Sequence, residues 1–173
     1  PYSSRILVNA GFLPSRNLQM KALIEGMYNP VSDKMKSDSM RVYLRNSSAP
    51  YNIIDPSRSI LDSNGNGMFD FHKAQNNVNY FISLKHRNSL ETWSSSAVSF
   101  ISNNLNYDFT TSVNRAFGNN LILVGSKYCI YSGEINNDGS IELSDELLTL
   151  DALINFSTGY FVEDINGDQL ADL

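Results

Sequence analysis

The chain has 173 residues, of which 42% are hydrophobic and 18% charged, enough for one sizeable core and a small appendage. No apolar run reaches the roughly 18–20 residues that a membrane-spanning helix needs, and the single cysteine, Cys129, has no partner for an internal disulfide. The net charge of −5 is divided unevenly along the chain. Residues 1–132 hold all 13 Lys and Arg with 8 acids, whereas residues 133–173 hold 10 acids and no Lys or Arg. A block charged in this way either remains disordered or binds cations, and its interleaved Leu, Ile, Phe and Tyr residues argue against disorder.

Short strand-like runs separated by turns occupy most of the chain before residue 133. Several runs alternate apolar and polar residues, and Asn, Gly, Ser and Pro fill the connections between them. We expect strands at residues 18–27, 40–45, 52–54, 68–72, 79–86, 91–100, 107–110 and 121–131. Strands of this number and spacing predict a mainly β protein with an antiparallel sandwich, of an immunoglobulin-like or prealbumin-like kind. We expect residues 1–17 to form an extended N-terminal segment and residues 18–132 the sandwich.

Residues 143–155 have the pattern of an amphipathic helix. Ser144 or Asp145 is expected to cap it, with acids in the first turn complementing the helix dipole. Leu147, Leu150, Leu153 and Ile154 form one apolar stripe, which we expect to pack into a core.

The segment before this helix has the oxygen-rich pattern of a calcium loop. Calcium takes six to eight oxygen ligands, and a twelve-residue loop supplies them from alternating positions around a glycine turn. Here Gly139 stands at the sixth position, and Ile141 at the eighth is expected to pair with its counterpart in a second loop. The expected ligands of the first loop are Glu134, Asn136, Asp138, the carbonyl of Ser140, Glu142 and Asp145.

The same spacing returns thirty residues later, at residue 164. Its twelfth position would fall at residue 175, past Leu173, and Gln169 stands where glycine is usual. We therefore expect one complete Ca²⁺ site and a second, truncated one. The expected ligands of the second loop are Asp164, Asn166, Asp168, Leu170 through its carbonyl, and Asp172.

A loop followed by a helix, with strand-like KYCIYS rather than a helix before it, is the arrangement of dockerin modules. Residues 133–173 resemble a dockerin-type duplicated repeat, which implies two calcium sites, an extracellular setting and a cohesin as protein partner. The stretches ALIEGMYNP, MRVYLRN, YFISLKHRNSLETWSS, FGNNLILVG and YCIYSGEINNDGS also resemble C-terminal regions of large secreted or surface proteins of the Bacteroidetes–Ignavibacteria group. That resemblance covers about residues 18–173 and implies a β-sandwich that leads into dockerin-like repeats.

Other segments admit a functional and a structural interpretation. The Asp62–Gly67 stretch imitates a calcium loop, but Lys73 at its twelfth position is a cation, and Asn-Gly favours a turn. Trp93, with Tyr and Arg neighbours, could stack on a sugar, although we favour a core anchor near a turn at residues 87–89. His72 and His86 lack zinc-site spacing, Cys129 is expected to be a buried inert thiol, and no catalytic fingerprint is present.

These observations predict a non-catalytic, calcium-stabilised module outside the cell. It would serve assembly, attachment or filament formation at the cell surface, through a protein partner or by self-assembly. The alternative is a carbohydrate-binding accessory region of a secreted polysaccharide- or protein-degrading enzyme. A nucleic-acid partner is not expected, because the 13 basic residues are spread along the chain rather than concentrated.

Overall fold

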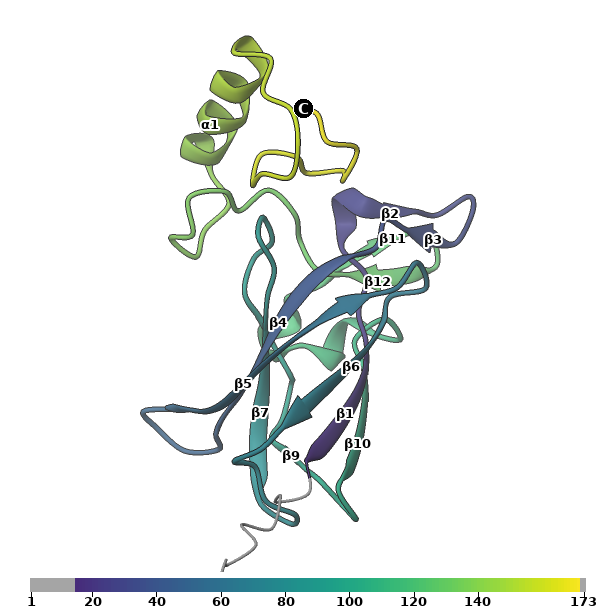
Figure 1. Cartoon of the computed structure of the whole chain (residues 1–173), viewed down its shortest axis with the longest axis vertical. Coiled ribbons are helices and arrows are strands. Elements are labelled where there is room, and N and C mark those ends of the chain that lie inside the picture. The colour runs from purple at the N-terminus through teal and green to yellow at the C-terminus, as the bar shows by residue number, and fades with distance from the viewer. Residues whose placement is uncertain (1–14, 172–173) are drawn as a thin grey trace, which may run out of the picture.

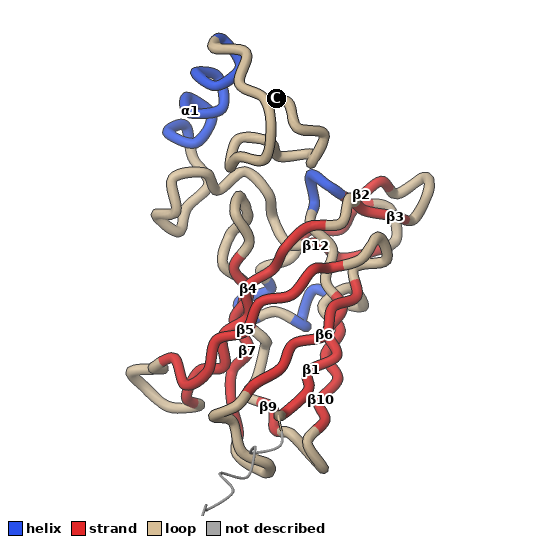
Figure 2. The backbone as a smooth tube through the Cα atoms, in the orientation of Figure 1, coloured by secondary structure: helices blue, strands red, loops and turns tan. Residues whose placement is uncertain are grey.

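The computed structural model describes residues 15–171 and is mainly β, with one α-helix (Figure 1). Residues 1–14 of the expected extended N-terminal segment, and the expected ligand Asp172, lie outside the described residues. Figure 2 shows two layers of strands and, at one end of the long axis, a mostly loop-like C-terminal region that carries the helix.

One layer is a three-stranded sheet in the order β10-β1-β6. Its strands are β1 (Arg16–Lys21), β6 (Asn66–Phe71) and β10 (Asn104–Asp108). β1 pairs antiparallel with β6 but parallel with β10, so the expectation of a purely antiparallel sandwich is wrong at this pair.

The other layer is a five-stranded antiparallel sheet in the order β5-β4-β7-β8, with β9 also paired to β7. Its strands are β4 (Asp38–Asn46), β5 (Ile53–Leu61), β7 (Asn79–Lys85), β8 (Thr92–Trp93) and β9 (Val98–Ser99). Side chains alternate between a buried and an outward face along β4, as the period of a strand requires. The inward residues of both layers form one apolar cluster, which includes Leu18, Met40, Val42, Leu44, Phe69, Phe71, Ile82 and Leu84. The prediction of a β-sandwich is therefore confirmed.

Smaller elements complete the sandwich. These are the 3-10 turns η1 (Glu25–Met27), η2 (Val113–Arg115) and η3 (Phe117–Asn119), and the hairpins β2 (Tyr28–Asn29) with β3 (Lys34–Met35) and β11 (Ile122–Val124) with β12 (Lys127–Cys129). The single helix α1 (Leu143–Ile154) matches the predicted helix closely. No helix in the described part of the chain has the length and apolar character needed to cross a membrane.

The strand predictions failed where the local pattern was interrupted. The run 121–131 is a hairpin, because Gly125 has a φ of +61° that lets the chain reverse. The run 91–100 is two separate short strands, β8 and β9, both paired to β7. The run 52–54 is longer than expected and forms β5 up to Leu61, and Pro56, which has no backbone N–H to donate, is accommodated because β5 is an edge strand.

The Asp62–Gly67 stretch is a turn, as expected. Asp62 Oδ1 accepts hydrogen bonds from the N–H groups of Asn64 and Asn66 at 2.8 and 2.9 Å, and these bonds hold its pKa below the ordinary value. Gly65 has a φ of +79°, and a Cβ there would lie 2.3 Å from the carbonyl oxygen of Ala22. The turn carries the chain from β5 in one sheet to β6 in the other.

Cys129 tests the packing of this core. Its side chain is fully buried, and burial, with a smaller contribution from the Glu25 carboxylate, raises the pKa of the thiol to about 12. We expect Cys129 to resist a thiol-specific reagent at pH 8 in the native protein and to react fully in denaturant, because only the thiolate attacks. Rapid labelling of the native protein would contradict this.

Candidate functional site

The first predicted calcium loop is buried at its two ends and exposed between them. Glu134 and Asp145 are 3% and 2% exposed, whereas Asn136, Asp138 and Glu142 are exposed. Gly139 has a φ of +92°, which fits the sharp turn expected at the sixth position.

The two loops repeat one hydrogen-bonding pattern at the predicted thirty-residue interval. In each, the third-position Asn Oδ1 accepts a bond of 2.8 Å from the N–H of the fifth residue. The fifth-position Asp Oδ1 then accepts a bond of 2.9 Å from the N–H of the seventh residue. These residues are Asn136, Asp138 and Ser140 in the first loop and Asn166, Asp168 and Leu170 in the second. The sequence repeat is therefore also a repeat of local structure.

Asp145 joins the first loop to α1. Its Oδ1 accepts hydrogen bonds from the N–H groups of Ile135 and Asn136, and its Oδ2 from that of Glu142. Burial would raise the pKa of this carboxyl, but these backbone donors outweigh it and hold the pKa below its ordinary value. The predicted cap at Ser144 or Asp145 is wrong, since Glu142 is the N-cap residue and Asp145 lies in the first turn, where its carboxylate bonds back to Glu142.

One buried oxygen in the first loop lacks a partner. Glu134 Oε1 accepts no hydrogen bond from any described residue, although its side chain is almost fully buried. A buried carboxylate oxygen of this kind is costly unless something binds it, and Glu134 stands at the first ligand position. The first loop thus has the donor chemistry that calcium prefers. In residues 15–171, however, no three His, Cys, Asp or Glu side chains already converge as a metal cluster.

The second loop has a competitor for its first ligand. Asp164 is 1% exposed, its Oδ2 lies 3.2 Å from Nη2 of Arg87, and its Oδ1 accepts the N–H of Asp168. The Arg87 guanidinium is thus already paired with the carboxylate that calcium would need in the second loop. The first loop therefore fits the ion better than the second.

Arg87, in the turn after β7, connects three parts of the molecule. Its Nε donates to Asp38 Oδ2 at 3.0 Å, its Nη1 to the carbonyl of Phe161, and its Nη2 to Asp164. Its guanidinium carbon also lies 4.6 Å from the centre of the Tyr160 ring. The side chain is only 10% exposed, so these contacts are largely shielded from water.

Asp38, at the start of β4, is the sandwich's counterpart to Arg87. Its carboxylate also accepts hydrogen bonds from the Tyr160 hydroxyl at 2.8 Å and from the Ser39 N–H, and lies 3.2 Å from His86 Nε2. Burial would raise the pKa of Asp38, but the bonds from His86, Tyr160, Arg87 and Ser39 outweigh it, so that the pKa lies far below the ordinary value.

Asn88 and Gly26 complete the contact between the sandwich and the second loop. Asn88 is fully buried, and its Nδ2 donates to the carbonyls of Val162 and Asp164 at 3.0 and 2.9 Å. A Cβ on Gly26 would lie 2.6 Å from the side chain of Ile165 and 2.7 Å from its carbonyl oxygen. The segment around residues 86–89 therefore serves to seat the C-terminal loops, a role that its sequence did not indicate.

The apolar stripe of α1 is not packed into a core, so that prediction is wrong. Leu147, Leu150, Leu153 and Ile154 are 56%, 38%, 37% and 65% exposed, and the buried residues of the helix are Asp145, Thr149 and Ala152. Figure 1 shows α1 at the far end of the molecule from the sheets. The helix packs by its small and polar face and leaves its leucines in solvent.

The expected pairing of Ile141 with the second loop is also wrong. Ile141 is 44% exposed, and the bridge at the end of the second loop joins Leu170 to Thr158 instead. The segment after α1 supplies this bridge because it folds back beside the second loop, where Gly159 N–H donates to the carbonyl of Gln169 at 2.8 Å.

Trp93 lies on the outer face of the five-stranded sheet and not in the core, contrary to the favoured interpretation. Arg45 lies over its ring at 4.7 Å, and Glu91 accepts a hydrogen bond of 2.8 Å from its Nε1. Tyr51 and Phe81 contact its ring at centroid distances of 6.0 Å. Trp93, Glu91, Tyr51 and Phe81 line a hollow of about 540 Å³ that also reaches Phe117, Asn120 and, in the first loop, Gly139. The Tyr and Arg residues beside Trp93 are Tyr51 and Arg45, both distant from it in sequence, whereas the nearby Arg87 binds Asp38 and the second loop.

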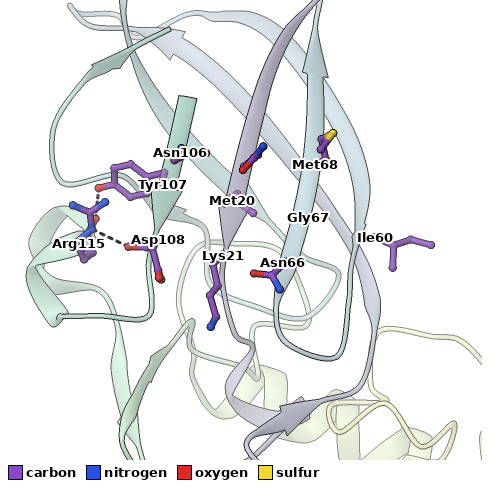
Figure 3. Close-up of a pocket in the computed structure, with 11 residues that line it drawn as sticks. Met20, Lys21, Ile60, Asn66, Gly67, Met68, Asn106, Tyr107, Asp108 and Arg115 are labelled. Carbon is purple, nitrogen blue, oxygen red and sulfur yellow. Dashed lines mark hydrogen bonds between the residues drawn. The ribbon is translucent and has the colours of Figure 1, made fainter. Parts of the chain in front are cut away.

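A hollow of about 740 Å³ lies on the three-stranded sheet and is drawn in Figure 3. Arg115 stacks over Tyr107 at 4.1 Å and accepts the Tyr107 hydroxyl through its carbonyl, and its Nε donates to the carbonyl of Asp108. Asp108 is the one carboxylate among the described lining residues, and its Oδ1 binds Thr110. This arrangement has the character of a structural corner rather than of paired acids for catalysis.

Comparison with known proteins adds little to this geometry. No family model matches the chain, and no curated protein matches it. Among solved structures, a chain from the crystal structure of a type II cohesin–X–dockerin complex of Acetivibrio cellulolyticus matches with a TM-score of 0.44 and 18% identity. The match covers 90% of this chain and 84% of that chain.

Substitution of Asp38 tests how much its buried contact with Arg87 stabilises the molecule. We expect Asp38→Asn to lower the free energy of unfolding at pH 7 by about 3 kcal/mol, because it leaves Arg87 buried with one charged partner fewer. Since the folded-state pKa is depressed, this contribution is present above the unfolded pKa of about 3.9 and is lost as pH falls through the folded value. Denaturant melts of wild type and variant should therefore converge in strong acid.

The exposed carboxylate of Asp70, on β6, provides the control. Asp70→Asn should change stability by less than about 0.5 kcal/mol at any pH. Equal effects of the two substitutions at pH 7 would show that Asp38 is not a special contact.

Proposed function

We propose that this chain is a non-catalytic protein-interaction module, stabilised by calcium and exposed outside the cell. The observation that carries the proposal is the apolar face of α1. Leu143, Leu147, Leu150 and Ile154 follow one another at spacings of four, three and four residues, and each is at least 38% exposed. A helix that leaves such a stripe in water has the form of a docking surface.

The charges around the apolar face of α1 indicate what kind of protein surface would bind it. Glu142, Glu146 and Asp151 are exposed beside the leucines, and residues 133–173 contain no Lys or Arg. A protein with an apolar patch rimmed by basic residues is therefore complementary. The dockerin resemblance supports the same kind of partner, a cohesin, and an extracellular setting in which calcium is abundant.

Calcium would act on the loop that presents the helix. Glu134, Asn136, Asp138 and Glu142, with the carbonyl of Ser140 and the carboxylate of Asp145, would hold the ion. The ion would compensate the carboxylates of an acidic block and engage the unpartnered Glu134 oxygen. The loop would then be fixed relative to Asp145 and thus to the first turn of α1.

We expect calcium to raise the melting temperature relative to chelator. Binding to the folded state alone stabilises it by about 2.7 kcal/mol at a hundred times the dissociation constant. The double variant Glu134→Gln, Asp138→Asn should lose this shift. Asp168→Asn should retain most of it, because Arg87 already pairs with Asp164, the first expected ligand of the second loop. Scanning calorimetry measures all three proteins, and an unchanged melt with and without chelator would remove calcium from the proposal.

The helix face is tested separately, with a panel of purified cohesin domains as the probe. We expect Leu147→Lys, Ile154→Lys to weaken binding roughly 30-fold, the effect of losing about 2 kcal/mol at a hot spot. Leu123→Lys, at a leucine 55% exposed on β11, is the matched control and should bind as wild type does.

Titration calorimetry in calcium gives the affinities, and sedimentation gives the oligomeric state. Failure of every cohesin to bind would refute the partner. Self-association that the double lysine variant abolishes would replace the partner by a second copy of the chain.

A further inference from the structure

Three cations stand directly opposite one another on the outer face of the five-stranded sheet. Arg41 of β4 is in register with Arg58 of β5 on one side and with Lys85 of β7 on the other. Neighbouring strands lie about 4.8 Å apart, so the three side chains rise from a single row. Like charges directly opposite each other on neighbouring strands destabilise a sheet. This row contains two such pairs, Arg41 with Arg58 and Arg41 with Lys85.

No acid in the described residues compensates this row. The ion pairs between residues 15 and 171 involve Arg45, His86 and Arg87, and none includes Arg41, Arg58 or Lys85. Arg58 donates one hydrogen bond, of 3.1 Å, to Ser39 Oγ. The acidic C-terminal block is held by Arg87 rather than by the row. The cost of the row is therefore not explained by the contact between the two parts of the chain.

The row lines a hollow of about 250 Å³ between the sheet and the C-terminal loops. Asn137, Tyr160 and Val162 form its far wall, and the Ser39 and Tyr160 hydroxyls, 3.0 Å apart, lie among its lining residues. Three cations around one small space are the chemistry that binds an oxyanion such as a carboxylate or a sulfate group.

The surface beside the row adds rings to these charges. A second hollow, of about 330 Å³, shares Arg41 and Arg58 and is completed by Tyr43, Pro56 and Ser57. The next row across the sheet contains Pro56, Tyr43, Ser83 and Trp93 in register. Arg45 lies over both Tyr43 and Trp93, at 5.9 and 4.7 Å. A free inorganic anion would use the row alone, whereas a polymer of rings that carry oxyanions would use both rows.

We propose that the outer face of the five-stranded sheet binds an acidic polysaccharide, whose carboxylate or sulfate groups occupy the row Arg58–Arg41–Lys85. Pyranose rings pack against Tyr43 and Pro56 beside that row. A single-stranded nucleic acid fits less well, because Arg45 already covers Trp93, the largest ring on this face and the one on which a base would stack. This face is distinct from the apolar face of α1, so the inference does not depend on the protein partner.

The test is affinity electrophoresis of the full chain in native gels containing calcium. The embedded probes are a sulfated glycosaminoglycan, a polygalacturonate and neutral dextran. We expect one or both acidic polymers to retard the protein and dextran to leave its mobility unchanged. The polymer that retards the protein more strongly identifies the preferred oxyanion, sulfate or carboxylate. Arg41→Gln, Arg58→Gln should weaken that retardation at least tenfold. Lys21→Gln, Lys73→Gln removes the same charge away from the row and should change it less than twofold.

Stability separates this proposal from a structural role. The variant Arg41→Gln, Arg58→Gln should melt at or above the wild-type temperature, because it relieves like-charge repulsion. Equal retardation of the two double variants would overturn the proposal, as would retardation by dextran. Stronger binding to a single-stranded oligonucleotide in a competition gel would also overturn it. Competition by inorganic sulfate at the same concentration of charge, with no advantage for the polymer, would reduce the face to a simple anion site.

Discussion

The guanidinium of Arg87 and the carboxylate of Asp38 form the contact on which the arrangement of this molecule depends. Arg87 reaches from the end of β7 to Asp38 at the start of β4, to the carbonyl of Phe161 and to Asp164. Both charged partners are nearly buried, so each would be costly without the other. One side chain thereby ties two strands of the sandwich to the second C-terminal loop.

This contact also makes the two loops unequal. They share a pattern of internal hydrogen bonds, repeated at the thirty-residue interval that their sequences predict. Yet Asp164 is bound to an arginine, whereas the corresponding Glu134 has a buried oxygen without a partner among the described residues. The second loop has the features of an anchor for the module, and the first has those of an ion site. A duplicated sequence can divide two tasks in this way when only one copy faces the neighbouring domain.

The placement of the second loop leaves two surfaces facing outward. α1 rests on Thr149 and Ala152 and presents its leucines to solvent, which is the basis of the proposed protein contact. The five-stranded sheet presents Arg41, Arg58 and Lys85 in one row, which is the basis of the proposed polysaccharide contact. One surface is apolar and acid-rimmed, the other is cationic with rings beside it. The two faces therefore suit partners of different chemistry.

By itself, the sequence determined the features that depend on local pattern. Alternation along β4, β6 and β7 predicted strands and a sandwich, and the spacing of acids and leucines predicted α1 and the repeated loops, because these follow from residues a few positions apart. Only the tertiary structure decided the features that join distant residues. The pairing of β1 with β10, the exposure of Leu147 and the position of Trp93 on an outer face were not predictable locally. An apolar residue becomes core only if another element covers it, and Arg41 becomes part of a cationic row only when Arg58 and Lys85 are brought into register beside it.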